Sequence, residues 1–150
     1  MADHRAEQVM AAVMGKLTSP PLATVPAAQV LRGRGEEVAA ELTPALRVYM
    51  GADPIVDPWA PQLIDSELEV FIEAKVHDAA TNVETLLNQV RKEVNIALAA
   101  DYTLGLGFVH AIVELGPARP QISGDMAKPA ASMEMSYRVK YRRSRTDPST

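Results

Sequence analysis

Apolar and polar residues alternate along three stretches of the chain, which is the pattern of strands that bury one face. The stretches run from Leu46 to Met50, from Leu68 to Val76 and from Ser132 to Arg142. The last stretch is the most regular, with apolar residues at Met133, Met135, Tyr137, Val139 and Tyr141. We interpret its methionines as core packing, with an interface as the alternative. Alternation of this kind indicates an antiparallel sheet that is covered on a single side.

A spacing of three and four residues between apolar positions predicts two helices. The longer helix is expected from about Ala80 to Ala100, and the shorter one from Arg5 to Leu17. The apolar stripe of the longer helix consists of Val83, Leu86, Leu87, Val90, Val94, Ala97 and Leu98. The stripe of the shorter one consists of Val9, Met10, Val13 and Leu17. Each stripe is expected to pack on the sheet.

Polar residues near both helix starts are candidate caps. Asp3 is available to cap the shorter helix. For the longer helix two alternatives stay open, because either Asp78 caps the start or Thr81 and Glu84 form a capping box.

Two further strands are expected, from Gln29 to Arg32 and from Phe108 to Leu115. In the second of these the alternation places Val109, Ala111, Val113 and Leu115 inward. Residues 116–130 contain glycine and proline near both ends and are expected to be a long connection. The predicted fold is therefore α+β, a mainly antiparallel sheet with the long helix and the N-terminal helix packed on one face. A chain of 150 residues is expected to form a single domain.

Composition supports an ordinary globular protein, since 47% of the residues are hydrophobic and 23% are charged. The absence of cysteine excludes disulfides, thiolate nucleophiles and cysteine-based metal sites. The first ten residues are charged and lack an apolar signal core. No apolar run reaches the roughly 20 residues that span a bilayer. The sequence thus predicts a soluble protein without membrane contact.

Motifs for catalysis or cofactor binding are missing from the sequence. The three histidines, His4, His77 and His110, fall in different predicted elements without ligand-like neighbours. Asp53, Asp57 and Asp65 do not have the spacing of a calcium loop. The glycine pairs in "RGRG" and "LGLG" lack the spacing of phosphate-binding loops and are interpreted as turns. We therefore expect no catalytic residues, no cofactor, no metal and no enzymatic activity.

The connection between the first two strands of the opening pattern is rich in proline and contains the chain's one tryptophan. Pro54, Pro58 and Pro61 surround Trp59, and Asp57 lies beside them. Proline stiffens a loop, and tryptophan is enriched at binding hot spots. Trp59 and Asp57 are therefore candidate interface residues, with packing of Trp59 within the chain as the alternative.

Basic residues gather near the C-terminus although the net charge of the chain is −4. They are Arg138, Lys140, Arg142, Arg143 and Arg145. Such a run is consistent with a solvated strand face followed by a flexible basic segment at about 143–150. The alternative is contact with an acidic partner surface or a phosphate backbone, for which Arg138, Arg142, Arg143 and Arg145 are the candidate residues.

Several phrases of the sequence resemble the tail terminator proteins of long-tailed bacteriophages. They are "LRVYMGADP", "LIDSELEVFIEAKV", "NVETLLNQVRKEVNIALAAD" followed by "YTLGLG", and "QISGDMAKPAASMEMSYRVKYRR". The likeness extends from about Gln29 to Arg142 in the order and type of elements. The chain departs from the family in the proline-rich "DPIVDPWAPQ" and in the basic "RRSRTDPST".

This resemblance implies a structural role in the virion, at the head-proximal end of the tail, after assembly in the host cytoplasm. Six subunits would form a ring on the last ring of tail tube protein, stop its polymerisation and offer a joining surface to head-completion or neck proteins. Transient contact with the genome DNA is a further implication. Residues 53–62 would be an interface arm anchored by Trp59.

Other functions stay open at the level of sequence. The first is another neck component, such as a head–tail joining, tail-completion or minor tail protein. A small ligand-binding or enzymatic domain is a different class, and it would need a convergent set of polar residues. A nucleic-acid-binding module is the third, and the negative net charge disfavours it.

Overall fold

The computed structural model describes residues 2–35, 38–57, 61–77, 82–116, 119–122 and 130–150. Two α-helices occur in this part of the chain, α1 (Arg5–Thr18) and α2 (Val83–Ala99). The 3-10 helices η1 (Ala27–Gln29) and η2 (Ala40–Leu42) are short connections. The strands are β1 (Val30–Arg32), β2 (Ala45–Met50), β3 (Ile55–Asp57), β4 (Leu63–His77), β5 (Val109–Leu115), β6 (Pro120–Ile122) and β7 (Ala130–Ser144).

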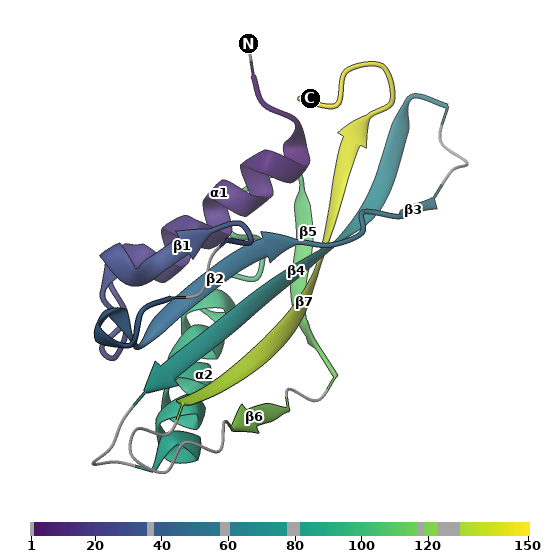
Figure 1. The fold of residues 1–150 in the computed structure, drawn as a ribbon. Helices are drawn as coiled ribbons and strands as arrows, with labels where there is room; N and C mark the ends of the chain where they lie inside the picture. The colour runs from purple at the N-terminus through teal and green to yellow at the C-terminus, as the bar shows by residue number, and fades with distance from the viewer. Residues whose placement is uncertain (1, 36–37, 58–60, 78–81, 117–118, 123–129) are drawn as a thin grey trace.

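The strands form one sheet with the order β1-β2-β4-β7-β5 (Figure 1). The short strand β3 pairs with β4, and β6 pairs with β7. Every pairing is antiparallel except that of β1 with β2. Strands β4 and β7 have 15 residues each and pair along their full length, from Leu63 opposite Ser144 to His77 opposite Ala130. These two long paired strands form the centre of the sheet.

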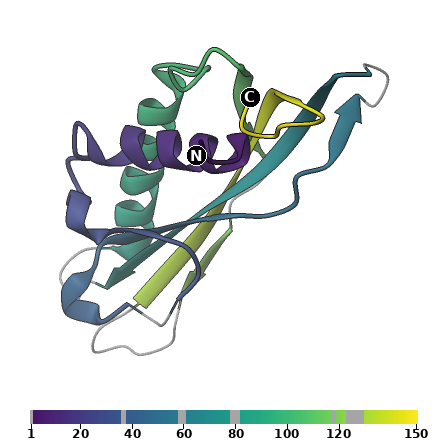
Figure 2. The same cartoon turned by 90° about the horizontal axis from the view of Figure 1, so that it is seen from above.

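Both helices pack on the same side of the sheet (Figure 2). The alternating residues of β4 and β7 meet them there, and the five inward positions predicted for β7 are all buried. The helix stripes close the core from the other side, with Val9, Val13, Leu87, Val90 and Val94 fully buried. The predicted α+β class is therefore confirmed, as are the predicted inward faces of β4 and β7.

The helix caps differ from those expected. His4 caps α1, because its ring Nδ1 accepts a hydrogen bond of 3.0 Å from the backbone N of Ala6. Asn82 caps α2, and its Oδ1 accepts from the backbone N of Glu84 at 2.9 Å and of Thr85 at 3.4 Å. The predicted cap Asp3 is thus wrong, and so are both alternatives for α2. Asp78 and Thr81 lie outside the described residues.

Strand β5 contains a β-bulge that the alternation does not predict. Val109 pairs with Tyr141, but the next paired residue is Ala111, so His110 is the additional residue. A bulge inserts one residue and reverses the facing of those that follow. Ile112 consequently packs against the core, whereas Val113 is 56% exposed. The prediction of an inward position is confirmed for Val109 and wrong for Ala111, Val113 and Leu115, which the bulge sets opposite Lys140, Arg138 and Ser136.

Candidate functional site

The connection between β2 and β4 is partly strand, which changes its shape from the expected loop. Strand β4 begins at Leu63, and β3 folds back along it with Ile55 opposite Ser66 and Asp57 opposite Asp65. We call residues 52–57 and 61–66 the arm. Figure 2 shows that this ribbon projects beyond the layer of helices.

The arm carries exposed apolar side chains. Ile55 is 50% exposed, Val56 40% and Leu63 43%, and Met50 at the foot of the arm is 41% exposed. Ile55 and Val56 are adjacent in β3, where the register with β4 shifts between Ile55 and Asp57, and both side chains are exposed. Apolar groups concentrated on a projecting element are typical of a surface that contacts another molecule.

The predicted interface residues Asp57 and Trp59 fall, in the sequence, at the end of β3 and between β3 and β4. Trp59 lies outside the described residues. Asp57 is the last residue of β3, and its side chain is outside what the structure describes. Their predicted role in an interface stays a prediction.

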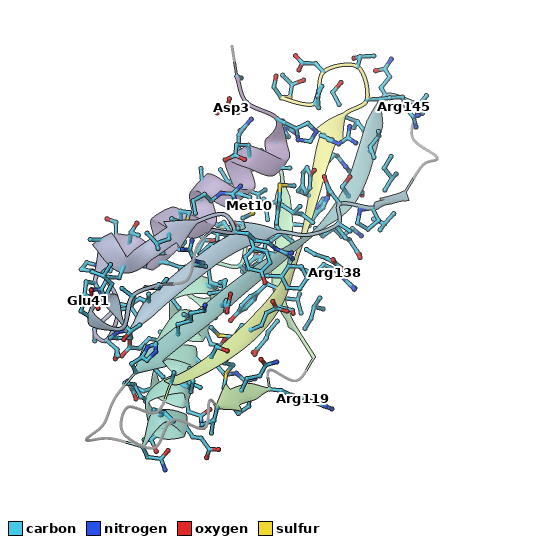
Figure 3. All side chains as sticks on the ribbon, viewed as in Figure 1. Asp3, Met10, Glu41, Arg119, Arg138 and Arg145 are labelled. Atoms are coloured by element: carbon cyan, nitrogen blue, oxygen red, sulfur yellow. The ribbon has the colours of Figure 1, made fainter. Side chains whose placement is uncertain are left out.

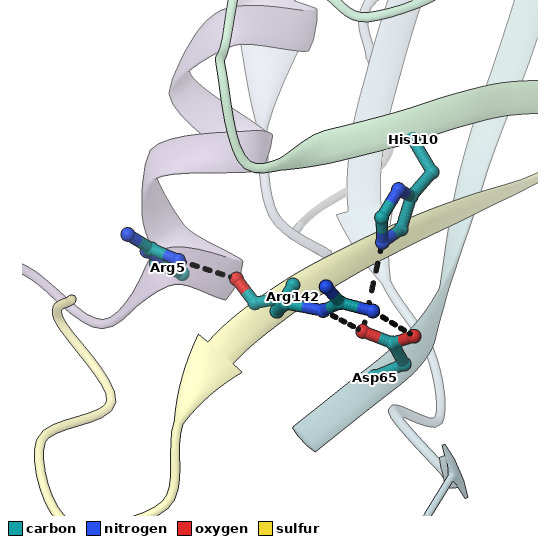
Figure 4. A network of polar contacts seen from close by, with 4 residues as sticks. All are labelled: Arg5, Asp65, His110 and Arg142. Atoms are coloured by element: carbon teal, nitrogen blue, oxygen red, sulfur yellow. Dashed lines mark hydrogen bonds and ion pairs between the residues drawn. The ribbon is translucent and has the colours of Figure 1, made fainter. Parts of the chain in front are cut away.

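Arg142 is held within the chain by a buried carboxylate (Figure 4). Its Nε donates to Oδ1 of Asp65 at 2.7 Å and its Nη2 to Oδ2 at 3.1 Å, while Asp65 is only 8% exposed. His110, the bulge residue, places Nε2 at 3.5 Å from the same Oδ1. The hydrogen bonds from Arg142 lower the pKa of Asp65 against the opposing effect of its burial. Arg5 adds a bond of 2.6 Å from its Nη1 to the carbonyl oxygen of Arg142.

The other predicted basic residues lie in different surroundings. Arg138 places Nε at 3.4 Å from Oε2 of Glu67 on the open face of the sheet. Arg143 is the next residue after Arg142, so it points to the opposite face, and it is half-buried. The backbone N of Arg145 donates to the carbonyl oxygen of Gln62 at 2.9 Å. Figure 3 accordingly shows Arg138 midway along β7 and Arg145 beside the start of β4.

The C-terminal residues lie against the first helix. Strand β7 includes Arg143 and Ser144, which were expected to belong to the flexible basic segment at about 143–150. Farther on, the backbone N of Arg5 donates to the carbonyl oxygen of Pro148 at 2.8 Å. The side chain of Gln8 donates to the carbonyl oxygen of Ser149 at 3.2 Å.

Two aromatic residues on the open face form a cluster that the sequence does not indicate. Tyr49 and Phe71 are opposite each other in β2 and β4, and their rings stack with centroids 5.5 Å apart. The guanidinium of Arg34 lies 4.5 Å above the Tyr49 ring, and the Tyr49 hydroxyl donates to Glu134. Burial, followed by the bond to Glu134, raises the pKa of Tyr49 to about 12. The only sequence signal was that Tyr49 and Phe71 occupy polar-face positions of their strands.

A hollow of about 330 Å³ adjoins this cluster. It is lined by Arg34, Gly35, Arg47, Tyr49, Glu73, Lys75 and Glu134. Cations and carboxylates are mixed along its wall, so the hollow offers no surface of a single charge. It gives no reason to prefer an anionic or a cationic ligand.

The described residues contain no group of three or more His, Asp or Glu side chains that could hold a metal ion. Within the same part of the chain, no helix has both the length and the apolar composition needed to cross a membrane. The hydrogen bonds from Arg142 to Asp65 and from Tyr49 to Glu134 join strands of one sheet.

Comparison with known proteins gives likeness at the level of structure. No protein-family model matches the chain, and no curated protein sequence matches it. A chain from a structure titled "Virion of native gene transfer agent (GTA) particle" matches with a TM-score of 0.56 and 18% identity. The match covers 88% of this chain and 94% of that one. A second solved chain covers 91% and 92% at 15% identity, but its TM-score of 0.38 is too low to support an argument. This chain and the chain of the gene transfer agent particle therefore share a fold over most of their lengths.

Proposed function

We propose that this chain is a structural subunit of a phage-like virion, and more specifically a tail terminator. The observation that carries the proposal is the shared fold with a chain of the gene transfer agent particle, which covers 94% of that chain. The sequence phrases that resemble tail terminators give independent support. In this proposal the chain acts by binding copies of itself and neighbouring virion proteins, without catalysis.

The arm supplies a physical route to this function. Subunits that contact one another head to tail close into a ring when the rotation between them allows it, and a closed ring leaves no growing end. A projecting ribbon with Ile55, Val56 and Leu63 exposed offers one half of such a contact. The proposed partners are further copies of the chain, the tail tube protein and a head-completion or neck protein.

The basic residues do not carry the proposal. Arg138 and Arg142 already pair with Glu67 and Asp65 of the same chain, so using them for an acidic partner or for DNA would require breaking these pairs. Contact of the basic stretch with the genome therefore stays a separate prediction.

The test is electron microscopy of tail tubes assembled from the tube protein of the same virion, with and without this chain. We expect tubes of limited length whose one end carries an additional ring. Tubes that keep growing, with the chain absent from their ends, would contradict the proposal. Binding to isolated heads or connectors in place of tubes would instead identify another neck component.

A further inference from the structure

Side chains from three adjacent strands meet at the foot of the arm. The hydroxyl of Tyr141 on β7 donates to Oδ2 of Asp53, which precedes β3, at 2.6 Å. Ser66 on β4 lies between them, because it is opposite Ile55 on one side and opposite Tyr141 on the other. Tyr141 and Ser66 are both fully buried. The bond thus passes over β4 and joins β7 to the segment that leads into β3.

We propose that the hydrogen bond between Tyr141 and Asp53 is a latch that fixes the arm to the sheet. This inference concerns the free chain and does not depend on the proposed function. It assigns to one side-chain bond the task of holding β3 in place.

The backbone pairing that holds this part of the arm is short and irregular. Strand β3 has three residues, and its register with β4 shifts between Ile55 and Asp57. Between β2 and β3, the backbone bonds are from Gly51 N to Glu69 O, from Glu69 N to Ala52 O and from Glu67 N to Pro54 O, at 2.8, 2.8 and 3.0 Å. A short, irregular pair of strands has little stability of its own. The bond from Tyr141 adds to these backbone bonds one side-chain bond to the strand on the far side of β4.

The chemistry of the pair suits a fixed bond. Burial, and then the bond to Asp53, raises the pKa of Tyr141, so its hydroxyl keeps the proton that it donates. The ring of Phe108 packs edge-on against the Tyr141 ring with centroids 6.4 Å apart and so limits its movement.

Gly51 makes a close contact with Phe71 and lies on the other side of Asp53 from β3 in the sequence. Gly51 passes so near to Phe71 that a Cβ at this position would lie 2.4 Å from Cε2 of that ring. The absence of a side chain at Gly51 thereby lets the backbone after β2 lie close to Phe71 of β4, two residues before Asp53. Asp53 thus lies two residues after this close contact and is bonded to Tyr141.

Amide hydrogen exchange measured by NMR tests the latch in the isolated chain. The amides of Glu67 and Glu69 are suitable probes because they donate to the carbonyl oxygens of Pro54 and Ala52. In Tyr141→Phe we expect both to exchange about tenfold faster, as for a local opening eased by the loss of one buried hydrogen bond. Asp53→Ala is expected to have the same effect and is the second variant if Tyr141→Phe does not fold.

Tyr137→Phe is the matched control. Tyr137 is also a buried tyrosine on the inner face of β7, but its hydroxyl donates to Asn95 on α2. Its replacement should leave the exchange of Glu67 and Glu69 unchanged. Unaltered exchange in both Tyr141→Phe and Asp53→Ala would overturn the proposal. So would an equal acceleration in Tyr137→Phe, since that would mean a general loss of stability.

Discussion

Asp65 is the residue where burial and charge oppose each other most directly. It is 8% exposed, and a buried carboxylate is costly unless it is paired. The guanidinium of Arg142 supplies two hydrogen bonds, and the side chain of Arg142 is 47% exposed. The pair therefore combines a buried acceptor with a partly hydrated donor, which limits its contribution to stability.

We predict that Asp65→Asn lowers the free energy of unfolding by about 1 kcal/mol at neutral pH, as expected for a partly exposed charged hydrogen bond. The pKa of Asp65 is lower in the folded chain than in the unfolded one. A carboxyl of this kind stabilises the fold above its unfolded pKa of about 3.9, and the contribution is lost as the pH falls through the lowered folded value. The difference between wild type and variant should therefore begin to shrink at about pH 4 and disappear only when the pH lies below the lowered folded pKa of Asp65.

Urea unfolding at a series of pH values measures this difference. Glu67→Gln is the control, since Glu67 is more exposed than Asp65 and its partner Arg138 is 45% exposed in its side chain. We expect a smaller loss there, within about 0.5 kcal/mol. A difference between wild type and Asp65→Asn that persists unchanged in acid would contradict the assignment.

The helix caps and the pair of Arg142 with Asp65 could not be predicted from the sequence. The caps His4 and Asn82 each stand directly before the first helical residue, but the sequence offered several polar residues near each start. Arg142 and Asp65 are far apart in the chain, and only the register of β4 with β7 brings them together. No local pattern encodes that register, so this pair could not be predicted.

At the scale of the element, β5 shows how one inserted residue changes a whole strand. The alternation in β4 and β7 is uninterrupted, and their inward residues were predicted correctly. In β5 the bulge at His110 places Ile112 opposite Val139 of the core and Val113 opposite Arg138. The bulge depends on pairing with β7, which the sequence of β5 alone does not contain. The short strands β3 and β6 were missed for a similar reason, since each is three residues long and flanked by proline-rich sequence.

The bulge predicts opposite outcomes for two neighbouring substitutions. Ile112→Ala should lower the free energy of unfolding by about 1–2 kcal/mol, because it removes apolar contacts from the core. Val113→Ala should change it by less than about 0.5 kcal/mol, because the side chain is mostly exposed. Thermal and urea unfolding of the two variants compare them directly. A larger effect at Val113 would mean that the simple alternation holds and the bulge does not.

For the whole molecule, the arm is the feature that links fold to function. The sequence indicated an interface at residues 53–62 from proline and tryptophan, and the structure adds the exposed side chains of Ile55, Val56 and Leu63 nearby. Their ribbon geometry was not predictable, because it requires β4 to extend to Leu63 alongside β7.

We predict that Ile55→Ser combined with Val56→Ser impairs assembly with tubes or with copies of the chain, by at least about tenfold in affinity, while the chain stays folded. Both side chains are exposed, so little core packing is lost. Trp59→Ala is expected to act in the same direction. Native mass spectrometry and tube binding measure assembly, and circular dichroism measures folding.

Val113→Ser is the control for this prediction, since Val113 is equally apolar and 56% exposed but lies on β5. It should assemble as wild type does. Normal assembly of the double variant would remove the arm from the proposed contact.

The meeting of the chain ends has a practical consequence. The first turn of α1 is bonded to residues Pro148 and Ser149, and Arg145 is bonded to Gln62 of the arm, so both ends emerge on the arm's side of the molecule (Figure 1). An affinity tag or fluorescent label fused at either end would crowd the same region. A probe attached instead to the outer side of α2, for instance at the 60% exposed Ile96, would leave that region accessible during purification and imaging.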